Sequence, residues 1–187
     1  FSCPNRDGAK GYGGCIYCSG SLSGEFAGSP RLSFREQFDM GKAQYLNKWG
    51  STLYMAYLQA GTNTYAPYER LVRVFGEALS IPDSVGLSIA TRADCVTPRV
   101  ADLLADISKK TYLTVELGLQ SSSDDTAARI NRCHTYAEFF SGYRLLNELG
   151  IKVCIHIING LPGETYEDMI KTARDVAVLL PYEVKIH

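Results

Sequence analysis

The sequence has 187 residues, of which 45% are apolar and 21% charged, and its 19 basic and 20 acidic side chains give a net charge of −1. This composition excludes a disordered, collagen-like or coiled-coil protein, and the evenly spread charge gives no indication of a nucleic-acid-binding face. There is no run of about 18 apolar residues and no secretory signal, so we expect a cytoplasmic protein with no membrane partner.

Three of the six cysteines fall in one glycine-rich stretch at the start of the chain. Cys3 is followed after eleven residues by Cys15 and after two more by Cys18. Clustered thiols favour a soft-metal site over disulfide bonds. A structural zinc site normally takes four Cys or His ligands, and the sequence offers no second cysteine pair and no closely spaced histidine pair. Three thiolates instead suit an iron–sulfur cluster with one iron open to an exchangeable ligand, with zinc and purely structural thiols as the alternatives.

After this stretch, predicted helices alternate with predicted strands. In chain order we expect a helix from Ser33 toward Trp49, a strand over 51–59, a helix over 67–79, a strand over 85–91, a helix beginning at Thr97-Pro98, a strand over 113–120, a short helix over 124–130, a helix from Thr135 to Gly150, a strand over 151–158, a helix from Thr165 to Pro181 and a strand over 183–186. Capping boxes mark three of the helix starts, namely Ser33 with Glu36, Thr135 with Glu138 and Thr165 with Asp168. Because the connections between strands are too long for hairpins, this order predicts an α/β protein with a parallel sheet and right-handed crossovers.

Polar and glycine-containing segments follow the predicted strands. These segments are residues 59–64, 91–94, 116–121 and 156–164. In parallel α/β folds the chemistry lies at the carboxyl ends of the strands. We therefore expect the four segments to line one mouth together with the cysteine loop.

The combined motifs resemble those of radical S-adenosylmethionine (SAM) enzymes, in particular the YhcC/YtqA-like family, which is related to the elongator catalytic subunit and the oxygen-independent coproporphyrinogen dehydrogenase. The motifs are FSCPNRDG at 1–8, GGCIYC at 13–18, TNTYAP at 62–67, ELGLQS at 116–121 and GLPGE at 160–164. The resemblance implies a partial (β/α)6 TIM-like barrel, with Phe1 at the end of the first strand and strands near 51, 85, 113, 151 and 183 as the second to sixth. We expect residues 1–187 to form one radical SAM core domain, a fragment truncated at both ends that lacks the first strand.

The resemblance also implies the cofactors and the residues that bind them. Cys3, Cys15 and Cys18 would hold a [4Fe-4S] cluster whose fourth iron binds the amino and carboxylate groups of SAM. The positions that match SAM contacts of the family are Tyr17, Ile158 and Gly160 near the adenine, Ala60, Gly61 and Thr62 near the methionine amino group, Gln120, Arg132 at the SAM carboxylate and His156 at the ribose.

Other side chains have a structural interpretation beside the functional one. Glu116, on a predicted buried strand, is either a cofactor ligand or a structural carboxylate, because a buried charge needs partners in both cases. Arg92 and Asp94 could pair with each other or cap the following helix. The segment 160–163 could be only a strand-to-helix turn.

The remaining cysteines, Cys95, Cys133 and Cys154, are expected to be small buried or loop thiols. Cys133 is the candidate for an additional catalytic role in handling the substrate. It lies beside Arg132 and His134 in a loop expected to face the mouth, where a nearby cation favours a reactive thiolate.

The resemblance therefore implies an enzyme of radical SAM chemistry. An electron from a donor such as flavodoxin or ferredoxin would pass through the cluster and cleave SAM reductively to methionine and a 5′-deoxyadenosyl radical, which abstracts a substrate hydrogen. The nearest members of the resembled group imply tRNA wobble-uridine modification, with tRNA as a partner. The alternatives are a radical SAM enzyme acting on a small-molecule or porphyrin substrate and a metal-stabilised binding module without turnover.

Overall fold

A parallel sheet organises the chain. The computed structural model describes residues 1–24, 27–29, 31–50 and 53–187. Within these residues five strands pair in chain order, as β1–β2–β3–β4–β5, and every pairing is parallel. The strands are β1 (Tyr54–Leu58), β2 (Ser84–Thr91), β3 (Tyr112–Gln120), β4 (Lys152–Ile157) and β5 (Glu183–Ile186). Sequential parallel strands joined through helices are the arrangement of a partial (β/α) barrel, so the predicted fold class is confirmed.

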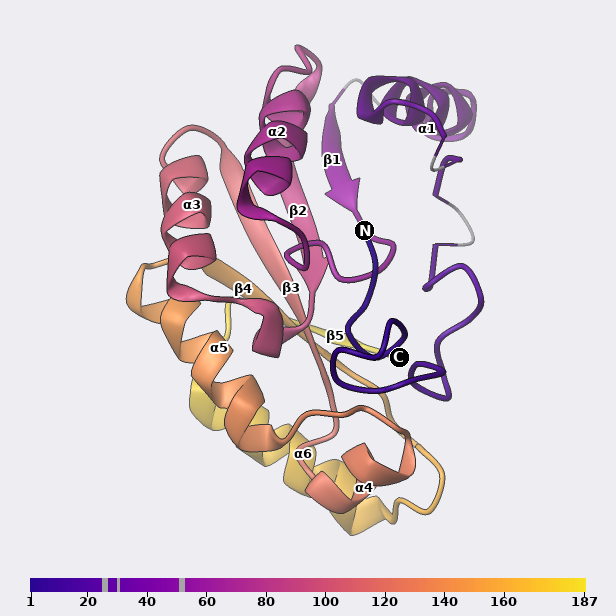
Figure 1. Ribbon diagram of the computed structural model, residues 1–187, viewed down its shortest axis with the longest axis vertical. Helices are drawn as coiled ribbons and strands as arrows, with labels where there is room; N and C mark the ends of the chain where they lie inside the picture. The colour runs from indigo at the N-terminus through magenta and orange to yellow at the C-terminus, as the bar shows by residue number, and fades with distance from the viewer. Residues whose placement is uncertain (25–26, 30, 51–52) are drawn as a thin grey trace.

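One helix precedes β1, and the others lie in the connections between the strands. They are α1 (Phe34–Trp49), α2 (Tyr68–Leu79), the 3-10 helix η1 (Ala93–Cys95), α3 (Pro98–Ser108), α4 (Asp124–Arg129), α5 (Tyr136–Glu148) and α6 (Tyr166–Leu179). Figure 1 shows α2, α3, α5 and α6 along one side of the sheet and the indigo N-terminal loop on the other, beside the carboxyl end of β1. The loop therefore lies where the helices leave the sheet uncovered.

The predicted capping boxes are formed in the structure. In each box the Ser or Thr side chain accepts a hydrogen bond from the backbone N–H three residues on, and the carboxylate at that position accepts one from the backbone N–H of the cap. The pairs are Ser33 with Glu36, Thr135 with Glu138 and Thr165 with Asp168. Each helix begins one residue after its cap, because the cap residue itself keeps an extended backbone.

Local features differ from the prediction at three places. Phe1 is not part of a described strand, because a strand is defined by repeated backbone hydrogen bonds that a single residue cannot provide. The described strands are therefore those expected as the second to the sixth. Residues 51–52 of the predicted strand lie outside the described residues, and β1 begins at Tyr54. The sequence gives no signal for η1, since three residues are too few to show a hydrophobic period.

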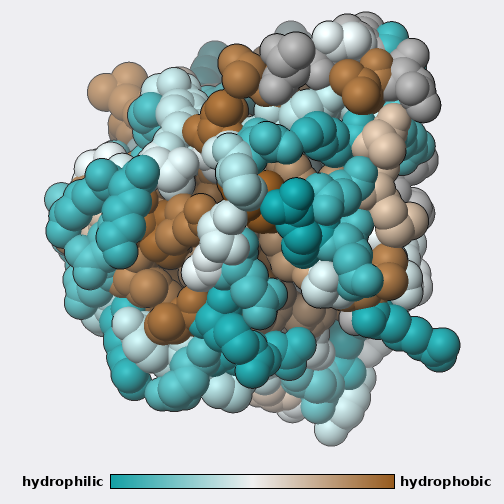
Figure 2. All heavy atoms as spheres, turned by 90° about the horizontal axis from the view of Figure 1, so that it is seen from above, coloured by the Kyte–Doolittle hydropathy of each residue, from teal (hydrophilic) through white to brown (hydrophobic). Residues whose placement is uncertain are grey.

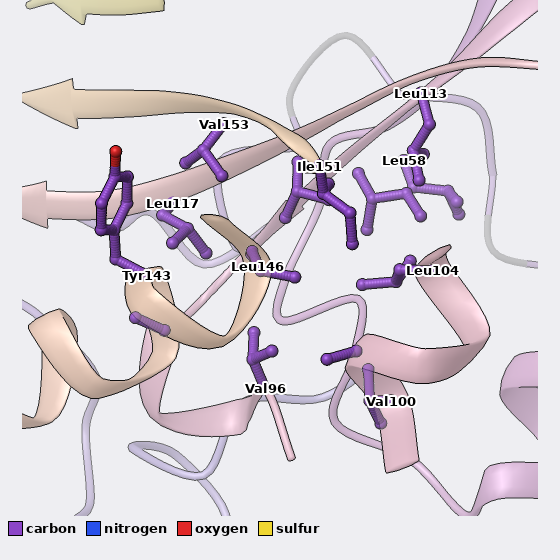
Figure 3. Packing of buried hydrophobic residues seen from close by; sticks show 14 of the residues in the cluster. Leu58, Val96, Val100, Leu104, Leu113, Leu117, Tyr143, Leu146, Ile151 and Val153 are labelled. Carbon is purple, nitrogen blue, oxygen red and sulfur yellow. The ribbon is translucent and has the colours of Figure 1, made fainter. Parts of the chain in front are cut away.

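Residues of β3 alternate between the two faces of the sheet. One set is buried in the hydrophobic core, namely Leu113, Val115, Leu117 and Leu119. Figure 3 shows this core, with Leu104 of α3 and Leu146 of α5 directed toward the strands. Because successive side chains of a strand point to opposite faces, Glu116 and Gln120 face the side that the helices do not cover.

The surface of the molecule is mixed in polarity. Viewed from above, hydrophilic residues form much of the rim and hydrophobic residues are visible toward the middle (Figure 2). The edge strand β5 exposes Val184 and Ile186. In the part of the chain that the structure describes, no helix has both the length and the apolar character needed to cross a membrane.

Gly142 of α5 packs directly against the backbone of η1. A Cβ atom at this position would overlap the carbonyl group of Ala93. We expect Gly142→Ala to lower the free energy of unfolding by about 1–3 kcal/mol, which is the usual cost of overpacking a core. Gly76→Ala is the matched control, because Gly76 is exposed in α2 and a Cβ there meets no atom within 4 Å. Urea unfolding that gives both variants wild-type stability or better would contradict the packing argument.

Candidate functional site

The cysteine loop borders a cavity at the carboxyl ends of the strands. The cavity is open to solvent and has a volume of about 130 Å³, and Cys3, Cys15 and Cys18 all line it. Residues from the ends of β1, β2, β3 and β4 also line it. The fold therefore places the three predicted metal ligands on one cavity, at the predicted mouth of the partial barrel.

Asn5 holds the cysteine loop in shape. Its side chain is 0% exposed, and its amide nitrogen donates to the Cys15 sulfur at 3.5 Å and to the Asn131 carbonyl at 2.5 Å. In return, the Asn131 amide donates to the Gly14 carbonyl at 2.8 Å, and the Gly14 N–H donates to the Asn5 carbonyl at 2.8 Å. The loop is thus clamped to the turn after α4, and sequence reasoning did not identify Asn5.

Cys15 is a buried thiol, 7% exposed. The Arg132 guanidinium donates to its sulfur at 3.8 Å. Burial opposes ionisation, but the charge of Arg132 and hydrogen bonds from Tyr17, Arg132 and Asn5 outweigh it and lower the pKa of Cys15. The thiolate is the form of cysteine that binds a metal, so this environment suits a ligand.

The arrangement of the thiols fits a cluster better than a single ion. Among the described residues, no three His, Cys, Asp or Glu side chains converge as the ligands of one metal ion must. Each thiolate of a four-iron cluster binds a different iron, so the sulfur atoms lie around the cluster and need not converge on a single metal position. Cys3, Cys15 and Cys18 on the wall of one cavity meet this requirement.

Three buried polar atoms of the cavity-lining residues have no hydrogen-bond partner among the described residues. They are Nε of Arg6, Oε1 of Gln120 and Nε of Arg132, and the Gln120 and Arg132 side chains both pack against Gly118. Gln120 has a backbone φ of +76°, a left-handed conformation that non-glycine residues seldom adopt. An unpaired buried polar atom costs about 1–3 kcal/mol, so three of them here indicate a site for a polar ligand.

The loop after β1 joins the cysteine loop through its backbone. Gly61 has a φ of +82°, and a Cβ there would lie 2.9 Å from the Phe1 carbonyl oxygen. The Thr62 N–H donates to the Ser2 carbonyl at 3.0 Å. Gly61 and Thr62 line the cavity, whereas Ala60 does not.

Only one of the three residues predicted to contact the adenine lines the cavity. Tyr17 lines the cavity, and burial raises the pKa of its phenol. Ile158 and Gly160 lie outside the cavity wall. The Ile158 N–H donates to the Gln120 carbonyl at 2.9 Å, so this residue fixes the end of β3, and Gly160 is exposed in the turn that follows β4.

The three remaining cysteines lie outside the cavity wall. Cys95 and Cys154 are buried, and burial raises the pKa of each thiol to about 12, as expected for structural cysteines. Cys133 is half-buried, and its thiol donates to the Asn131 side chain at 3.4 Å. It packs against Gly11 in the cysteine loop, so the thiol does not face the mouth as predicted.

Arg92 and Asp94 form a buried bidentate ion pair. The guanidinium Nε and Nη2 lie 2.9 and 2.8 Å from the carboxylate oxygens, and each side chain is 3% exposed. Lys10 of the cysteine loop binds the same carboxylate at 2.8 Å. Arg92 also donates to the carbonyls of Arg132 and Cys133 at 2.9 and 3.2 Å. Of the two structural interpretations, pairing is confirmed, and the pair links the cysteine loop to the loop that presents Arg132.

Glu116 is surrounded by hydrogen-bond donors from the other strands. Its carboxylate accepts from Ser88 at 2.6 Å, Tyr57 at 2.9 Å and His156 Nε2 at 2.7 Å, and Lys185 Nζ lies 3.7 Å away. Burial opposes ionisation, but the hydrogen bonds from His156, Ser88 and Tyr57 lower the pKa of Glu116 to about 2. Glu116 and His156 both line the cavity. The carboxylate therefore has protein partners without any cofactor.

Three residues of the cavity wall, namely Leu22, Ser23 and Ala90, lie outside the segments that were predicted to line the mouth. Arg6 and Gly14 belong to the cysteine loop, and Gln59, Thr91, Arg92 and Gly118 belong to the predicted strand-end segments, but none of these six was predicted to contact a cofactor. Position was the available signal for Ala90, because it directly precedes the segment 91–94.

The chain belongs to the radical SAM superfamily, whose family model matches residues 8–176. It is 47% identical over 187 residues to the protein YtqA of Bacillus subtilis and 39% identical over 188 residues to the protein YhcC of Escherichia coli K12. Both alignments cover 100% of this chain and 58% and 60% of those proteins, so the chain spans somewhat over half of their length. The predicted family is confirmed. A third relative, a tRNA uridine(34) acetyltransferase of Dehalococcoides mccartyi, is 34% identical over 92 residues, which cover 49% of this chain and 19% of that protein.

Solved structures share the fold. Elp3 from the archaeon Methanocaldococcus infernus superposes with a TM-score of 0.66 at 21% identity, covering 83% of this chain and 43% of that one. The Escherichia coli coproporphyrinogen III oxidase HemN, described as a radical SAM enzyme, gives a TM-score of 0.57 at 24% identity over 70% of this chain and 30% of its own. At these identities the likeness supports the partial barrel alone.

The Arg92–Asp94 pair predicts a pH-dependent contribution to stability. Although burial opposes ionisation, Arg92 and Lys10 lower the pKa of Asp94 to about 2. A carboxyl group whose pKa is lowered in the folded state stabilises the fold at pH values above its pKa in the unfolded chain, which is about 4. This stabilisation is lost as the pH falls toward 2. We expect Asp94→Asn to lower the free energy of unfolding at pH 7 by about 3–5 kcal/mol, because the Arg92 charge stays buried without its partner.

The check is denaturant unfolding at several pH values between 7 and 2.5. The gap between wild type and Asp94→Asn should narrow below about pH 4, because the Asp94 carboxyl then becomes protonated in the unfolded wild type while it stays ionised in the folded protein. Asp102→Asn is the control, because Asp102 is exposed on α3 and its replacement should cost less than about 0.5 kcal/mol. A gap that stays constant down to pH 2.5 would contradict the ion-pair account.

Proposed function

We propose that the chain is the core of a radical SAM enzyme that binds a [4Fe-4S] cluster and SAM in this cavity. The observation that carries the proposal is one cavity lined by Cys3, Cys15 and Cys18 and by the residues of two unpaired buried atoms, Gln120 Oε1 and Arg132 Nε. Soft thiolates suit iron–sulfur clusters. A carbonyl oxygen and a guanidinium N–H suit the ammonium and carboxylate of an amino acid, and SAM carries both groups.

The three cysteines would hold the cluster and leave one iron open for SAM. When bound, these two groups supply reductive cleavage of SAM to a 5′-deoxyadenosyl radical. The protein's own part is to favour the thiolate of Cys15 through Arg132 and Asn5, which lower its pKa, and to hold the loop in place. These contacts exist in the protein chain itself, so the site is preorganised for the cluster.

For SAM we propose contacts on the same wall of the cavity. Gln120 accepts from the SAM ammonium, and Arg132 donates to its carboxylate. Gly61 and Thr62 border the methionine end, and Tyr17 offers an aromatic surface to the adenine. The other positions implied by the family resemblance, namely Ala60, Ile158 and Gly160, do not line this cavity, and of these Ile158 donates a backbone hydrogen bond to Gln120.

For the substrate we propose a wobble uridine of tRNA, with an external one-electron donor of the flavodoxin or ferredoxin type. Similarity to a tRNA uridine(34) acetyltransferase supports the substrate class. Loss of one modified tRNA nucleoside in a deletion strain tests it, with the full-length gene returned as the control. An unchanged nucleoside profile would favour a small-molecule or porphyrin substrate.

The radical chemistry is tested by anaerobic reconstitution of the full-length protein with iron and sulfide, followed by SAM and dithionite. We expect 5′-deoxyadenosine from the wild type and none from a Cys15→Ala, Cys18→Ala variant, because the cluster loses two of its three thiolates. Cys95→Ala is the matched control and should retain the product, since Cys95 lies outside the cavity. A four-iron wild-type protein that forms no 5′-deoxyadenosine would favour a binding module without turnover.

Gln120→Leu tests the proposed SAM contact. Removal of the unpaired Oε1 acceptor should weaken SAM binding about tenfold or more, because a hydrogen bond to a charged group contributes about 1.5–3 kcal/mol. The measurement is equilibrium binding of SAM to the reconstituted protein without reductant. Gln44→Leu is the control, since Gln44 is exposed on α1. Equal SAM affinity in the wild type and Gln120→Leu would remove Gln120 from the site.

A further inference from the structure

A second polar cluster lies on the inner face of the sheet, and each strand contributes one side chain to it. The residues are Tyr57 of β1, Ser88 of β2, Glu116 of β3, His156 of β4 and Lys185 of β5, all gathered around the Glu116 carboxylate. Two of them, Glu116 and His156, line the cavity. The cluster therefore borders the same space as the cysteines without containing any of them.

Glu116 fixes the orientation of the His156 ring and the tautomer of the neutral ring. A carboxylate only accepts hydrogen bonds, so His156 Nε2, 2.7 Å from Glu116 Oε2, is the nitrogen that carries the hydrogen. In the neutral ring the other nitrogen, Nδ1, is then an acceptor. No described residue donates to Nδ1. The ring thus offers an oriented acceptor on the border of the cavity.

Lys185 supplies a donor next to this acceptor. Lys185 and His156 are register partners on neighbouring strands. The Lys185 ammonium lies 3.7 Å from the Glu116 carboxylate and 5.7 Å from the centre of the Tyr57 ring, and its side chain is 43% exposed. An ammonium has three N–H donors, so it can bind a ligand oxygen while it faces Glu116. The His156 ring and the Lys185 ammonium therefore both lie beside the same carboxylate oxygen of Glu116.

A purely structural role explains this cluster poorly. Burying ionised side chains costs desolvation free energy that their mutual attraction only partly offsets, and apolar residues of similar volume often stabilise a fold as well or better. The opposite face of the same strands uses such residues throughout the core. A polar inner face next to a cavity is therefore better explained by a ligand.

We propose that this cluster is the substrate subsite and that it recognises an imide or lactam edge, in which an N–H lies beside a carbonyl. His156 Nδ1 accepts from the N–H, Lys185 Nζ donates to the carbonyl oxygen, and Glu116 and Tyr57 are positioning residues. A uracil ring presents this edge at its N3–H, so the inference rests on the proposed function and deepens it. Glu116 and His156, which we first expected to bind SAM, are thereby assigned to the substrate.

The test uses full-length protein loaded with cluster and SAM, without reductant. The probes are two RNA anticodon stem-loops that differ only in carrying uridine or N3-methyluridine at the wobble position. We expect the wild type to bind the uridine RNA about tenfold more tightly, because methylation removes the hydrogen that His156 accepts. His156→Phe keeps an aromatic ring and should bring the ratio of the two dissociation constants close to one.

Further variants separate positioning from folding. Glu116→Gln should also lower the ratio, and Glu116→Asp, which keeps the carboxylate, should restore part of it. Lys185→Met should weaken both RNAs by a similar factor, because its donor binds the carbonyl that both bases keep. Glu148→Gln is the control, since Glu148 is exposed on α5, and it should leave the ratio unchanged.

A wild-type ratio near one, or a ratio that survives His156→Phe, overturns the inference. Formation of 5′-deoxyadenosine by the wild type, measured in parallel with dithionite, distinguishes this failure from failure of the proposed function. A wild type that cleaves SAM but binds neither RNA overturns the subsite and the tRNA substrate and leaves the radical chemistry intact. A loaded wild type that cleaves no SAM overturns the proposed function itself.

Discussion

The buried ion pair between Arg92 and Asp94 is the interaction on which the arrangement of the cavity depends. Part of the cavity wall consists of loops, which have no strand ladder to fix them. This pair joins those loops, because Asp94 also binds Lys10 of the cysteine loop and Arg92 binds the carbonyls of Arg132 and Cys133. Both side chains of the pair are buried, so displacement of either loop would take a hydrogen-bond or ion-pair partner away from a buried charge. The positions of the thiols and of the Arg132 guanidinium are therefore coupled.

In the partial barrel, the two faces of each strand have different roles. Because side chains alternate along a strand, every second residue packs in the core on one face of the sheet, and the residues between them build the site on the other face. On β3 the outward set, such as Val115 and Leu117, is apolar and fully buried, whereas Glu116 accepts hydrogen bonds and Gln120 lines the cavity. A register slip of one residue would exchange the two sets and place a carboxylate in the core. Core packing thus fixes the geometry of the site.

Local rules explain what the sequence could predict. The capping boxes, the strand order and the clustered thiols each depend on residues close together in the chain, and all are found in the structure. What it could not predict depends on contacts between distant segments. Asn5 reaches Asn131, Gly142 meets Ala93, and Glu116 takes partners from four other strands. The same reason accounts for Cys133, whose thiol direction follows from a turn with positive φ that no local pattern indicates.

The two halves of the cavity differ in how completely their polar atoms are paired. On the cofactor side, Gln120 Oε1 and Arg132 Nε are buried without partners, and Gln120 holds a strained backbone. On the substrate side, the Glu116 carboxylate is already satisfied by Ser88, Tyr57 and His156. Folding has already removed water from a buried unpaired atom, so a ligand that forms a hydrogen bond with it gains binding free energy without a further desolvation cost. A ligand that forms a hydrogen bond with a solvated group must first displace water, so its net gain in binding free energy is smaller. In the proposed assignment, the cofactor side of the cavity therefore binds its ligand tightly, and the substrate side binds and releases its ligand.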